Sequence, residues 1–322
     1  MTSDTVEIPA IYSTLSAEKL LDSIVSQYSL SEPLSCQFYC RGFSDTYQVF
    51  SSETLFYLRV YRANLRSLEE VKFELDALKY LQENNIKVAA PLRNNNGELV
   101  NLVSAPEGER YVIITENAEG ESLDLDDSNV CYQFGSAVAQ LHQASLGFSS
   151  SYSRQLIDSG YLIKQSVNRL EPIYSKFSDK WQYFKRQAQV LINSFDQLIG
   201  ENIDFGFCHG DLHFANTHNC DNALTFFDFD LCGFGPRAYD LAVLKRFAIA
   251  NRRQKEWWLP FIGGYQAVRT LSDDDLQLTN LCIRIRHLWE TSMMADQRID
   301  TQLWNLTEKT FDNLIRNITL KK

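Results

Sequence analysis

One polar stretch inside apolar sequence constrains the fold of this chain more than any other feature. It runs from Phe207 to Asn216, and an apolar run that ends at Asp228 follows it. The turn-forming segment 219–222 (Asn-Cys-Asp-Asn) lies midway, which predicts a loop and then a β-hairpin that brings Asn216 and Asp228 to the same end. An amide oxygen and a carboxylate at one point suit a magnesium ion, and the carboxylate of Asp211, left uncoordinated, could accept a proton. The arrangement suits phosphoryl transfer.

The two motifs resemble those of the phosphotransferases related to aminoglycoside and choline kinases, which share the protein-kinase-like fold. His-Gly-Asp-Leu-His-Phe-Ala-Asn is similar to the catalytic loop of that family, and Phe-Asp-Phe-Asp is similar to its metal-binding strand end. The resemblance implies that Asp211 is the catalytic base and that Asn216 and Asp228 hold magnesium against the phosphates of ATP. Two motifs in the right order and spacing are a more specific signal than either alone.

The same resemblance implies an α+β, bilobal protein-kinase-like fold. A small N-terminal antiparallel-sheet lobe, residues 1–116, would bind the nucleotide, and a larger, mainly helical C-terminal lobe, residues 117–322, would carry the catalytic and acceptor-binding groups. The apolar pattern indicates strands between Cys36 and Val60, and helices dominate the C-terminal part. A chain of 322 residues with 44% hydrophobic content can bury a substantial core in one large domain or two lobes.

The turn at residues 41–45 corresponds in the resembled family to the flap over the nucleotide phosphates. There Ser44, Asp45 and Thr46 would present backbone N–H groups and a hydroxyl to the phosphates. From the residues alone an ordinary hairpin is an equal alternative, because Gly42 is the only glycine in the turn.

The segment from Glu116 to Gly120 follows a buried-type strand, Tyr111–Thr115, and reads as a break between lobes. The resemblance implies that this is the hinge whose backbone, at Glu116 and Ala118, hydrogen-bonds the adenine. The sequence without the resemblance favours a plain loop.

An arginine and a glutamate in the N-terminal part are expected to form an ion pair. The capping-box spacing of residues 67–70 (Ser-Leu-Glu-Glu) predicts a helix that runs to about Asn84, and Glu74 lies on its apolar stripe, where it needs a cation. Arg59, in a predicted strand, stands where the family carries a phosphate-binding lysine that pairs with this glutamate. Arginine can grip carboxylate and phosphate together, but the exchange is not neutral. The alternative is a surface arginine with a solvated glutamate.

A zinc site is a competing interpretation of the central stretch, since Cys208, His209, His213, His218 and Cys220 lie close together in the sequence. Structural zinc sites usually pair their ligands in short knuckles such as Cys-x-x-Cys, which is absent here. We therefore favour a buried strand position for Cys208 and a loop-bracing hydrogen bond for His209.

Several classes of protein are disfavoured by composition. No apolar run approaches the roughly 18 residues of a membrane span, and the N-terminus lacks a basic region followed by an apolar one. The seven scattered cysteines are typical of reduced thiols, and a net charge of -10 argues against nonspecific nucleic-acid binding. We expect a cytoplasmic protein with no membrane or nucleic-acid partner.

The expected activity is an ATP-dependent, magnesium-requiring transfer of the γ-phosphate to a hydroxyl group. The acceptor stays open among small alcohols, aminoglycosides and protein serine or threonine. A pseudokinase that binds nucleotide and acts as an interaction module is the alternative; Arg59 supports it, whereas intact Asp211, Asn216 and Asp228 argue against it.

Two further features are assigned a role only because of the resemblance to this family. Asp240 by default caps a helix, but the matching family aspartate braces the catalytic loop. Residues 263–265 (Gly-Gly-Tyr) and the helix around residues 284–289 resemble the branch with bacterial stress-response kinases and homoserine-type kinases.

Overall fold

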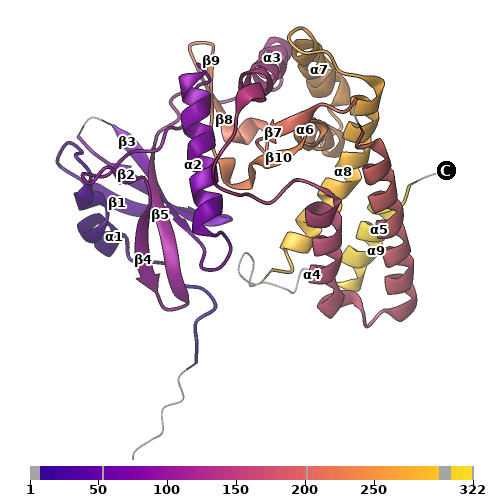
Figure 1. Ribbon diagram of the computed structural model, residues 1–322, viewed down its shortest axis with the longest axis horizontal. Coiled ribbons are helices and arrows are strands. Elements are labelled where there is room, and N and C mark those ends of the chain that lie inside the picture. The colour runs from indigo at the N-terminus through magenta and orange to yellow at the C-terminus, as the bar shows by residue number, and fades with distance from the viewer. Residues whose placement is uncertain (1–7, 53, 201, 297–305, 321–322) are drawn as a thin grey trace, which may run out of the picture.

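The computed structural model describes residues 8–52, 54–200, 202–296 and 306–320. These residues form a sheet-rich N-terminal lobe and a mainly helical C-terminal lobe (Figure 1), so the predicted α+β, bilobal architecture is confirmed. The last long strand of the first lobe ends at Glu116, the residue after which the sequence analysis expects the boundary between the lobes. In the described part of the chain, no helix is both long enough and apolar enough to cross a bilayer.

The N-terminal lobe is built on one antiparallel sheet with the strand order β1-β2-β3-β5-β4. Its strands are β1 (Ser35–Arg41), β2 (Ser44–Phe50), β3 (Leu55–Tyr61), β4 (Asn101–Ala105) and β5 (Gly108–Glu116). Alternate residues of β2 and β3, such as Val49 and Val60, are buried against Leu20 of the short helix α1 (Ala17–Ser23) and Val25 of the 3-10 turn η1 (Val25–Gln27). This small core packs the N-terminal helical segment against the sheet.

Helix α2 (Leu68–Glu83) lies between the sheet and the C-terminal lobe (Figure 1). Its predicted capping box is present: the amide of Glu70 donates to the Ser67 hydroxyl at 3.2 Å, and the amide of Ser67 donates to the Glu70 carboxylate at 2.9 Å. The apolar residues of α2, including Leu78, share one core with Phe226 and Phe229 of the C-terminal lobe. The helix therefore joins the two lobes mechanically.

Two small sheets in the C-terminal lobe carry the motif residues. Strand β7 (Phe205–Cys208) pairs with β10 (Gly233–Pro236), while β6 (Glu121–Ser122), β8 (Thr217–Cys220) and β9 (Ala223–Phe226) form the other sheet. The predicted hairpin is confirmed as β8 and β9. Its two turn residues, Asp221 and Asn222, have φ values of 51° and 64°, which these residue types tolerate better than most.

Helices make up the rest of the C-terminal lobe. The longer ones are α3 (Ser128–Ala144), α4 (Gln165–Tyr174), α5 (Ser178–Leu198), α6 (Ala238–Ala250), α7 (Leu259–Gln266), α8 (Asp273–Met293) and α9 (Glu308–Ile318). Short helical turns are η2 (Ser145–Gly147), η3 (Gly160–Lys164), η4 (Phe214–Asn216), η5 (Phe229–Leu231) and η6 (Gln254–Trp258). Helix α8 is central, because Ile285 and Leu288 share a core with residues of α4, α5 and α9.

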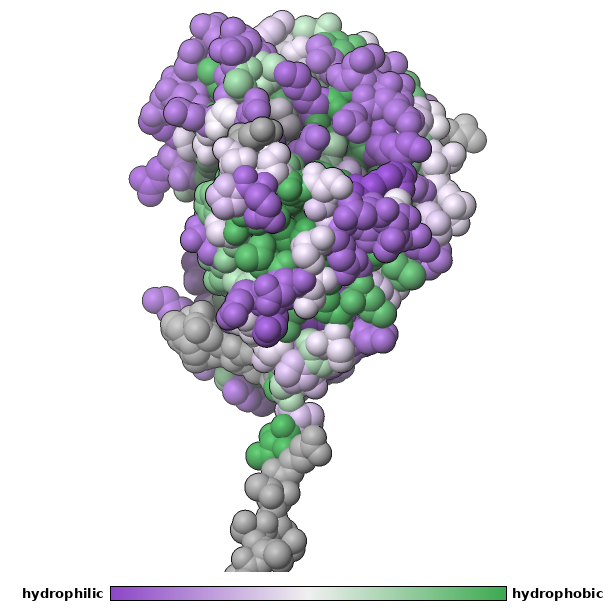
Figure 2. Space-filling view, turned by 90° about the vertical axis from the view of Figure 1, so that its left-hand side faces the viewer, coloured by the Kyte–Doolittle hydropathy of each residue, from purple (hydrophilic) through white to green (hydrophobic). Residues whose placement is uncertain are grey.

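The outer face of the N-terminal lobe is mixed in character. Seen from that side, hydrophobic residues gather in the middle of the molecule between hydrophilic ones (Figure 2). Phe38 on β1, Phe50 on β2 and Leu102 on β4 are among the exposed hydrophobic residues of this lobe. Scattered exposed apolar side chains are common on folded proteins and need no special role.

Candidate active site

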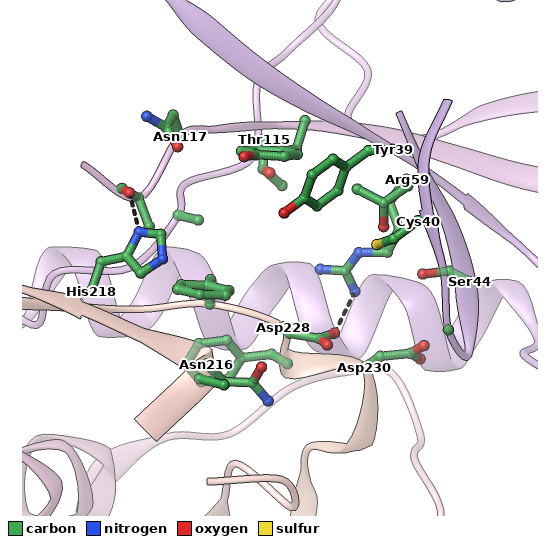
Figure 3. Close-up of a pocket in the computed structure, with 18 of the residues that line it drawn as sticks. Tyr39, Cys40, Ser44, Arg59, Thr115, Asn117, Asn216, His218, Asp228 and Asp230 are labelled. Carbon is green, nitrogen blue, oxygen red and sulfur yellow. Dashed lines mark hydrogen bonds and ion pairs between the residues drawn. The ribbon is translucent and has the colours of Figure 1, made fainter. Parts of the chain in front are cut away.

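The predicted site residues gather around a cavity of about 360 Å³ between the lobes, which we call the interlobe pocket (Figure 3). Those that line it are Ser44, Thr46, Arg59, Glu116, Ala118, Asn216 and Asp228. Three others do not line it: Asp45, Glu74 and Asp211. Asp211 instead faces a neighbouring cavity, and the other two are buried.

The loop after β7 is held by a buried carboxylate. The backbone amides of His209 and Gly210 each donate to Asp240 at 2.8 Å, and His142 Nε2 lies 3.1 Å from the same carboxylate. Asp240 is fully buried, which opposes its ionisation, but its hydrogen bond and charge interaction with His142 lower its pKa below the ordinary value. Asp240 thus braces the loop that carries Asp211, as the resemblance implies.

Two further features fix the loop backbone. Gly210 has φ of +83°, and a Cβ there would lie 2.0 Å from the carbonyl oxygen of Leu231, so no other residue fits. His209 Nε2 lies 3.0 Å from the carbonyl oxygen of Phe227, and its Nδ1 accepts from the amide of Asp211 at 3.3 Å. Both bonds are made by one neutral imidazole, and burial lowers the His209 pKa accordingly.

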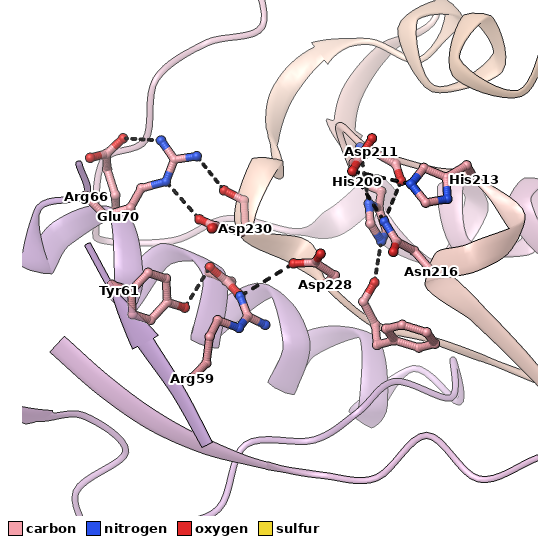
Figure 4. A network of polar contacts seen from close by, with 12 residues as sticks. Arg59, Tyr61, Arg66, Glu70, His209, Asp211, His213, Asn216, Asp228 and Asp230 are labelled. Atoms are coloured by element: carbon pink, nitrogen blue, oxygen red, sulfur yellow. Dashed lines mark hydrogen bonds and ion pairs between the residues drawn. The ribbon is translucent and has the colours of Figure 1, made fainter. Parts of the chain in front are cut away.

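Asp211 lies at the end of this loop, close to His213 and Asn216 (Figure 4), and a residue of α8 also binds it. Nη2 of Arg286, on α8, contacts its carboxylate at 2.5 Å, and the Asn216 amide donates to its carbonyl at 3.0 Å. Burial favours the protonated acid, but the Arg286 guanidinium and His213 hold the pKa of Asp211 well below its usual range. Asp211 is therefore ionised at neutral pH and can accept a hydrogen bond from a hydroxyl group.

The side chains of Asn216 and Asp228 lie at the floor of the interlobe pocket (Figure 3). Because the Nδ2 atom of Asn216 is directed to Asp211, its amide oxygen is left on the side that also holds Asp228. The side chain of Asp228 is 51% exposed to the pocket, yet the protein around it displaces bulk water, and this desolvation raises its pKa to about 6. Asp228 adopts a left-handed backbone, φ 64° and ψ 59°, which is uncommon for a residue with a side chain.

Asp230, the last residue of the second motif, is a contributor to which the sequence assigned no role. It lines the interlobe pocket, and among the described residues its buried Oδ2 has no hydrogen-bond partner. Its Oδ1 accepts from Arg66 Nε at 2.9 Å, and its backbone carbonyl accepts from Arg66 and Arg154. This residue lines the same pocket as Asn216 and Asp228, and its orphaned carboxylate oxygen is of the type that suits a hard divalent cation.

Arg154 corrects one expectation from the sequence. The segment from residue 149 to 202 showed a helical pattern without readable chemistry, yet Arg154 also donates to the carbonyl of Glu70 and lies 3.6 Å from the Glu74 carboxylate. Arg154 comes from the C-terminal lobe and Glu70 from α2, so the contact ties the lobes together. Nothing in the local sequence distinguishes this arginine from a solvated one.

The predicted pair of Arg59 and Glu74 is present. Nη1 of Arg59 contacts the Glu74 carboxylate at 2.7 Å and lies 3.9 Å from the carboxylate of Asp228. The Tyr61 hydroxyl donates to the other oxygen of Glu74 at 3.0 Å. Since the side chain of Glu74 is fully buried and that of Arg59 is 12% exposed, the alternative of a solvated surface pair is wrong.

The turn between β1 and β2 and the start of β2 cover the pocket, and the side chains there point in two different directions. Ser44 and Thr46 line the pocket, whereas the side chain of Asp45 is fully buried and pairs with Arg110 at 2.8 Å. Period-two alternation along β2 turns Asp45 to the opposite face from its neighbours. The expectation that all three face a nucleotide therefore does not extend to the carboxylate of Asp45.

The segment after β5 forms the edge of the pocket opposite the motifs. Glu116 and Ala118 line it, and the amide of Glu116 donates to the carbonyl of Ala90 at 2.8 Å. His218, on β8, also lines the pocket and contacts the Ala118 carbonyl at 2.6 Å through Nδ1. This bond ties the segment between the lobes to the hairpin, and no pattern in the sequence predicts it.

The residues considered for zinc are engaged separately. Cys208 Sγ contacts the carbonyl of Gly235, and the two histidines described above, His209 and His218, bond to different carbonyl groups. Across the described residues, no cluster of three or more histidine, cysteine or acidic side chains has the arrangement of a metal site. The bonds of His209 to the loop agree with the bracing role that the sequence favoured.

A second cavity, of about 590 Å³, lies beside the interlobe pocket, and we call it the α8 pocket. Gly42, Phe43 and Ala215 line both cavities. Asp211 lines the α8 pocket, so the predicted base stands where the two cavities meet. The arrangement can hold a charged group in one cavity and a second molecule with a hydroxyl group in the other.

The sequences of several known proteins align with most of this chain. An uncharacterised protein of Deinococcus radiodurans is 31% identical over 292 residues, which cover 89% of this chain and 84% of that protein. The amicoumacin kinase of Bacillus subtilis is 24% identical, with 84% and 82% covered. The homoserine kinase of Neisseria meningitidis serogroup B is 23% identical, with 83% and 84% covered.

Solved structures share the fold. A microcompartment-associated aminopropanol kinase superimposes with a TM-score of 0.76 at 22% identity and covers 94% of each chain. An amicoumacin kinase, determined with AMP-PNP, Ca2+ and Ami, also has a TM-score of 0.76, at 20% identity, with 94% and 92% covered. The kinase-like part of the predicted fold is thereby confirmed.

The family follows from the sequence profile. The profile of the phosphotransferase enzyme family matches residues 36–274, which is well over half of the chain and includes both motifs. The resemblance drawn from the two motifs is confirmed, and this chain belongs to the phosphotransferase enzyme family.

Proposed function

We propose that this protein transfers the γ-phosphate of ATP to a hydroxyl group of a small molecule and requires Mg2+. The observation that carries the proposal is the convergence of Asp211, Asn216 and Asp228 at the junction of two cavities, with the Arg59–Glu74 pair above them. Inert relatives of kinases usually lack one of these parts. An active enzyme is therefore favoured over a pseudokinase.

In the proposed reaction each residue has one task. Asn216 and Asp228 would hold Mg2+, which supplies charge neutralisation of the phosphates. Arg59 would bind phosphate oxygens while Glu74 fixes its position, and the amides near Ser44 and Thr46 would donate to the same phosphates. The backbone at Glu116 and Ala118 would bind the adenine. These roles rest on positions in the interlobe pocket.

Asp211 would orient the acceptor hydroxyl and take its proton. In the transfer, the acceptor O–H bond breaks, an O–P bond forms and the bond between the γ-phosphate and ADP breaks. Arg286 keeps Asp211 ionised, so the main contribution of Asp211 before the transfer would be to align the acceptor hydroxyl. The hydroxyl proton would pass to Asp211 as the O–P bond forms.

Relatives that act on small molecules support a small acceptor. Those with printed activities are an amicoumacin kinase, homoserine kinases and an aminopropanol kinase. All seven cysteines are free thiols, which fits a reducing compartment, and we propose a cytoplasmic location.

Nucleotide binding with and without metal tests the proposal. Saturating ATP at about 100 times its Kd should add about 2.7 kcal/mol to the free energy of unfolding with Mg2+, and much less with EDTA, as measured from melting temperatures. An equal rise in melting temperature with Mg2+ and with EDTA would show that Asn216 and Asp228 are not metal ligands. A screen of phosphate transfer to amino alcohols, hydroxy acids, aminoglycosides and a serine-rich protein then identifies the acceptor.

A further inference from the structure

His218 lies at one end of the interlobe pocket, and Arg59 and Ser44 lie at the other (Figure 3). Side chains alternate along β8, so Thr217 is buried in the lobe while His218 is half-buried and lines the pocket. A nucleotide that places its phosphates at Arg59 and Ser44 would therefore place its base at the end where His218 stands.

The imidazole of His218 is held in one orientation. Its Nδ1 lies 2.6 Å from the carbonyl oxygen of Ala118, and its ring meets that of Phe227 edge to face, with centroids 4.8 Å apart and an interplanar angle of 70°. The segment that carries this carbonyl is packed against β8, because Gly120 has φ of +97° and a Cβ there would lie 2.2 Å from the carbonyl oxygen of Asn219. The histidine and its partner are thus fixed relative to each other.

The bond to Ala118 determines which ring nitrogen carries the hydrogen. A carbonyl oxygen can only accept, so Nδ1 of His218 carries the hydrogen and donates it. In a neutral imidazole the other nitrogen is then an acceptor. Nε2 of His218 is turned toward the pocket (Figure 3), and it has no hydrogen-bond partner among the residues that the structure describes. The pocket therefore contains a directed acceptor that a bound molecule can satisfy.

An adenine nucleotide can satisfy this acceptor through only one group of its base. Adenine joined to ribose has N–H bonds only on its 6-amino group, whereas hypoxanthine and guanine have an oxygen at that position. An oxygen facing Nε2 of His218 would bring two acceptors together and leave both unpaired, which costs affinity. The acceptor on His218 therefore matches a 6-amino purine and mismatches a 6-oxo purine.

We propose that His218 selects adenine nucleotides over 6-oxo purine nucleotides, because its Nε2 accepts a hydrogen bond from the 6-amino group. This inference rests on the proposed function, since it assigns this end of the interlobe pocket to the base of the nucleotide. The ring of Phe227, which also lines the pocket and contacts His218, gives the base an apolar surface. His218 is then a specificity-determining residue that acts on the nucleotide and not on the acceptor.

Three nucleoside diphosphates that share ribose and phosphates test the selectivity. ADP carries an amine at position 6 of the purine, IDP carries an oxygen there and purine riboside 5′-diphosphate carries only hydrogen. Calorimetry of the full chain with Mg2+ should show ADP binding about tenfold or more tighter than IDP, and about threefold to tenfold tighter than purine riboside 5′-diphosphate. Equal affinity for ADP and purine riboside 5′-diphosphate would mean that Nε2 does not bind the amine, and it overturns the inference.

Substitutions of His218 locate the effect, with the affinity of ADP divided by that of purine riboside 5′-diphosphate as the readout. His218→Phe keeps an aromatic ring but loses the acceptor, so this ratio should fall by about threefold or more. His218→Gln keeps a donor and an acceptor, so its ratio should stay closer to that of the parent. A purely structural role of His218 would weaken both nucleotides alike, and an unchanged ratio in His218→Phe contradicts the inference.

His287→Phe is the matched control. His287 is also half-buried, but it lies on α8 and does not line the interlobe pocket. The affinity ratio of this variant should equal that of the parent. A fall as large as that of His218→Phe would show that the ratio does not report on His218, and it would count against the inference.

The outcomes separate the inference from the proposed function. If ADP binds with Mg2+ and IDP binds equally well, the role of His218 is wrong and the kinase proposal stands. If none of the three nucleotides binds with Mg2+, the proposed function fails, and the inference fails with it.

Discussion

The interlobe pocket and the α8 pocket share a wall but are built differently. The interlobe pocket takes its candidate metal ligands from one loop and hairpin, with Asn216 and Asp228 within thirteen residues of each other. The α8 pocket takes its groups from helix faces far apart in the chain, such as Arg246 on α6 and Glu290 on α8. The first site therefore depends on spacing within one short segment, and the second depends on how helices far apart in the chain pack together.

The two pockets also differ in how their carboxylates are paired with cationic side chains. In the interlobe pocket, Asp228 is half exposed and Asp230 has an unpartnered oxygen among the described residues. In the α8 pocket both carboxylates are engaged by arginine. The first pocket can therefore offer oxygen ligands to a cation, whereas in the second Asp211 and Glu290 are balanced by Arg246 and Arg286.

Asp211 stands between the pockets, and its substitution has the largest expected effect. Asp211→Asn keeps the size of the side chain but removes the carboxylate that aligns the acceptor, so turnover should fall by roughly two to four orders of magnitude. Nucleotide affinity should change little, because the base contributes to the transition state more than to nucleotide binding. Steady-state kinetics with an acceptor from the screen, and calorimetry with ATP, measure both. Turnover at the parental rate would show that Asp211 is not the base.

Arg59→Ala tests the interlobe side of the comparison. It leaves Glu74 buried with only Tyr61 and Arg154 nearby, so we expect a loss of about 3 kcal/mol in the free energy of unfolding, together with weaker nucleotide binding. Denaturant unfolding and calorimetry measure the two effects. If neither the free energy of unfolding nor the nucleotide affinity changed, Arg59 would have no role in stability or nucleotide binding.

Arg59→Lys is the matched conservative exchange, because it restores the residue that the resembled family carries. It keeps the charge but loses the planar fork that reaches Glu74. Turnover higher than that of the parent would indicate a degraded site, while lower turnover would indicate a site adapted to arginine.

Phe43→Leu has the smallest expected effect and tests the shared wall. The stacked pair with Trp289 contributes about 1 kcal/mol, and its loss should lower the melting temperature slightly. Because the pair closes the α8 pocket, the KM for the acceptor should rise several-fold while the KM for ATP changes less. Phe205→Leu, an exposed phenylalanine remote from both pockets, is the control. Equal changes in both KM values would show that the turn acts on the pockets together.

Sequence reasoning succeeded where the signal is local. The hairpin follows from turn formers between two apolar arms, and the start of α2 follows from the capping box at Ser67. The pairing of Arg59 with Glu74 also followed, because a carboxylate on an apolar helix stripe demands a cation and the resemblance named one. In each of these features, the spacing of residues along a short stretch of chain determines which residues come into contact.

The sequence could not predict which distant side chains complete the site. Arg286 reaches Asp211 from 75 residues away, and Arg154 reaches the carbonyl of Asp230 from 76 residues away. An arginine on a helix looks the same whether it is solvated or buried in an ion pair, because its partner is chosen by how the elements pack. The sequence by itself determined the hairpin and the family, and it singled out the loop that carries Asp211. Only the tertiary structure decided that Asp45 is turned away from the pocket, that Asp211 is held by α8, and that arginines outnumber carboxylates on the described walls of the α8 pocket, since these depend on packing between elements far apart in the chain.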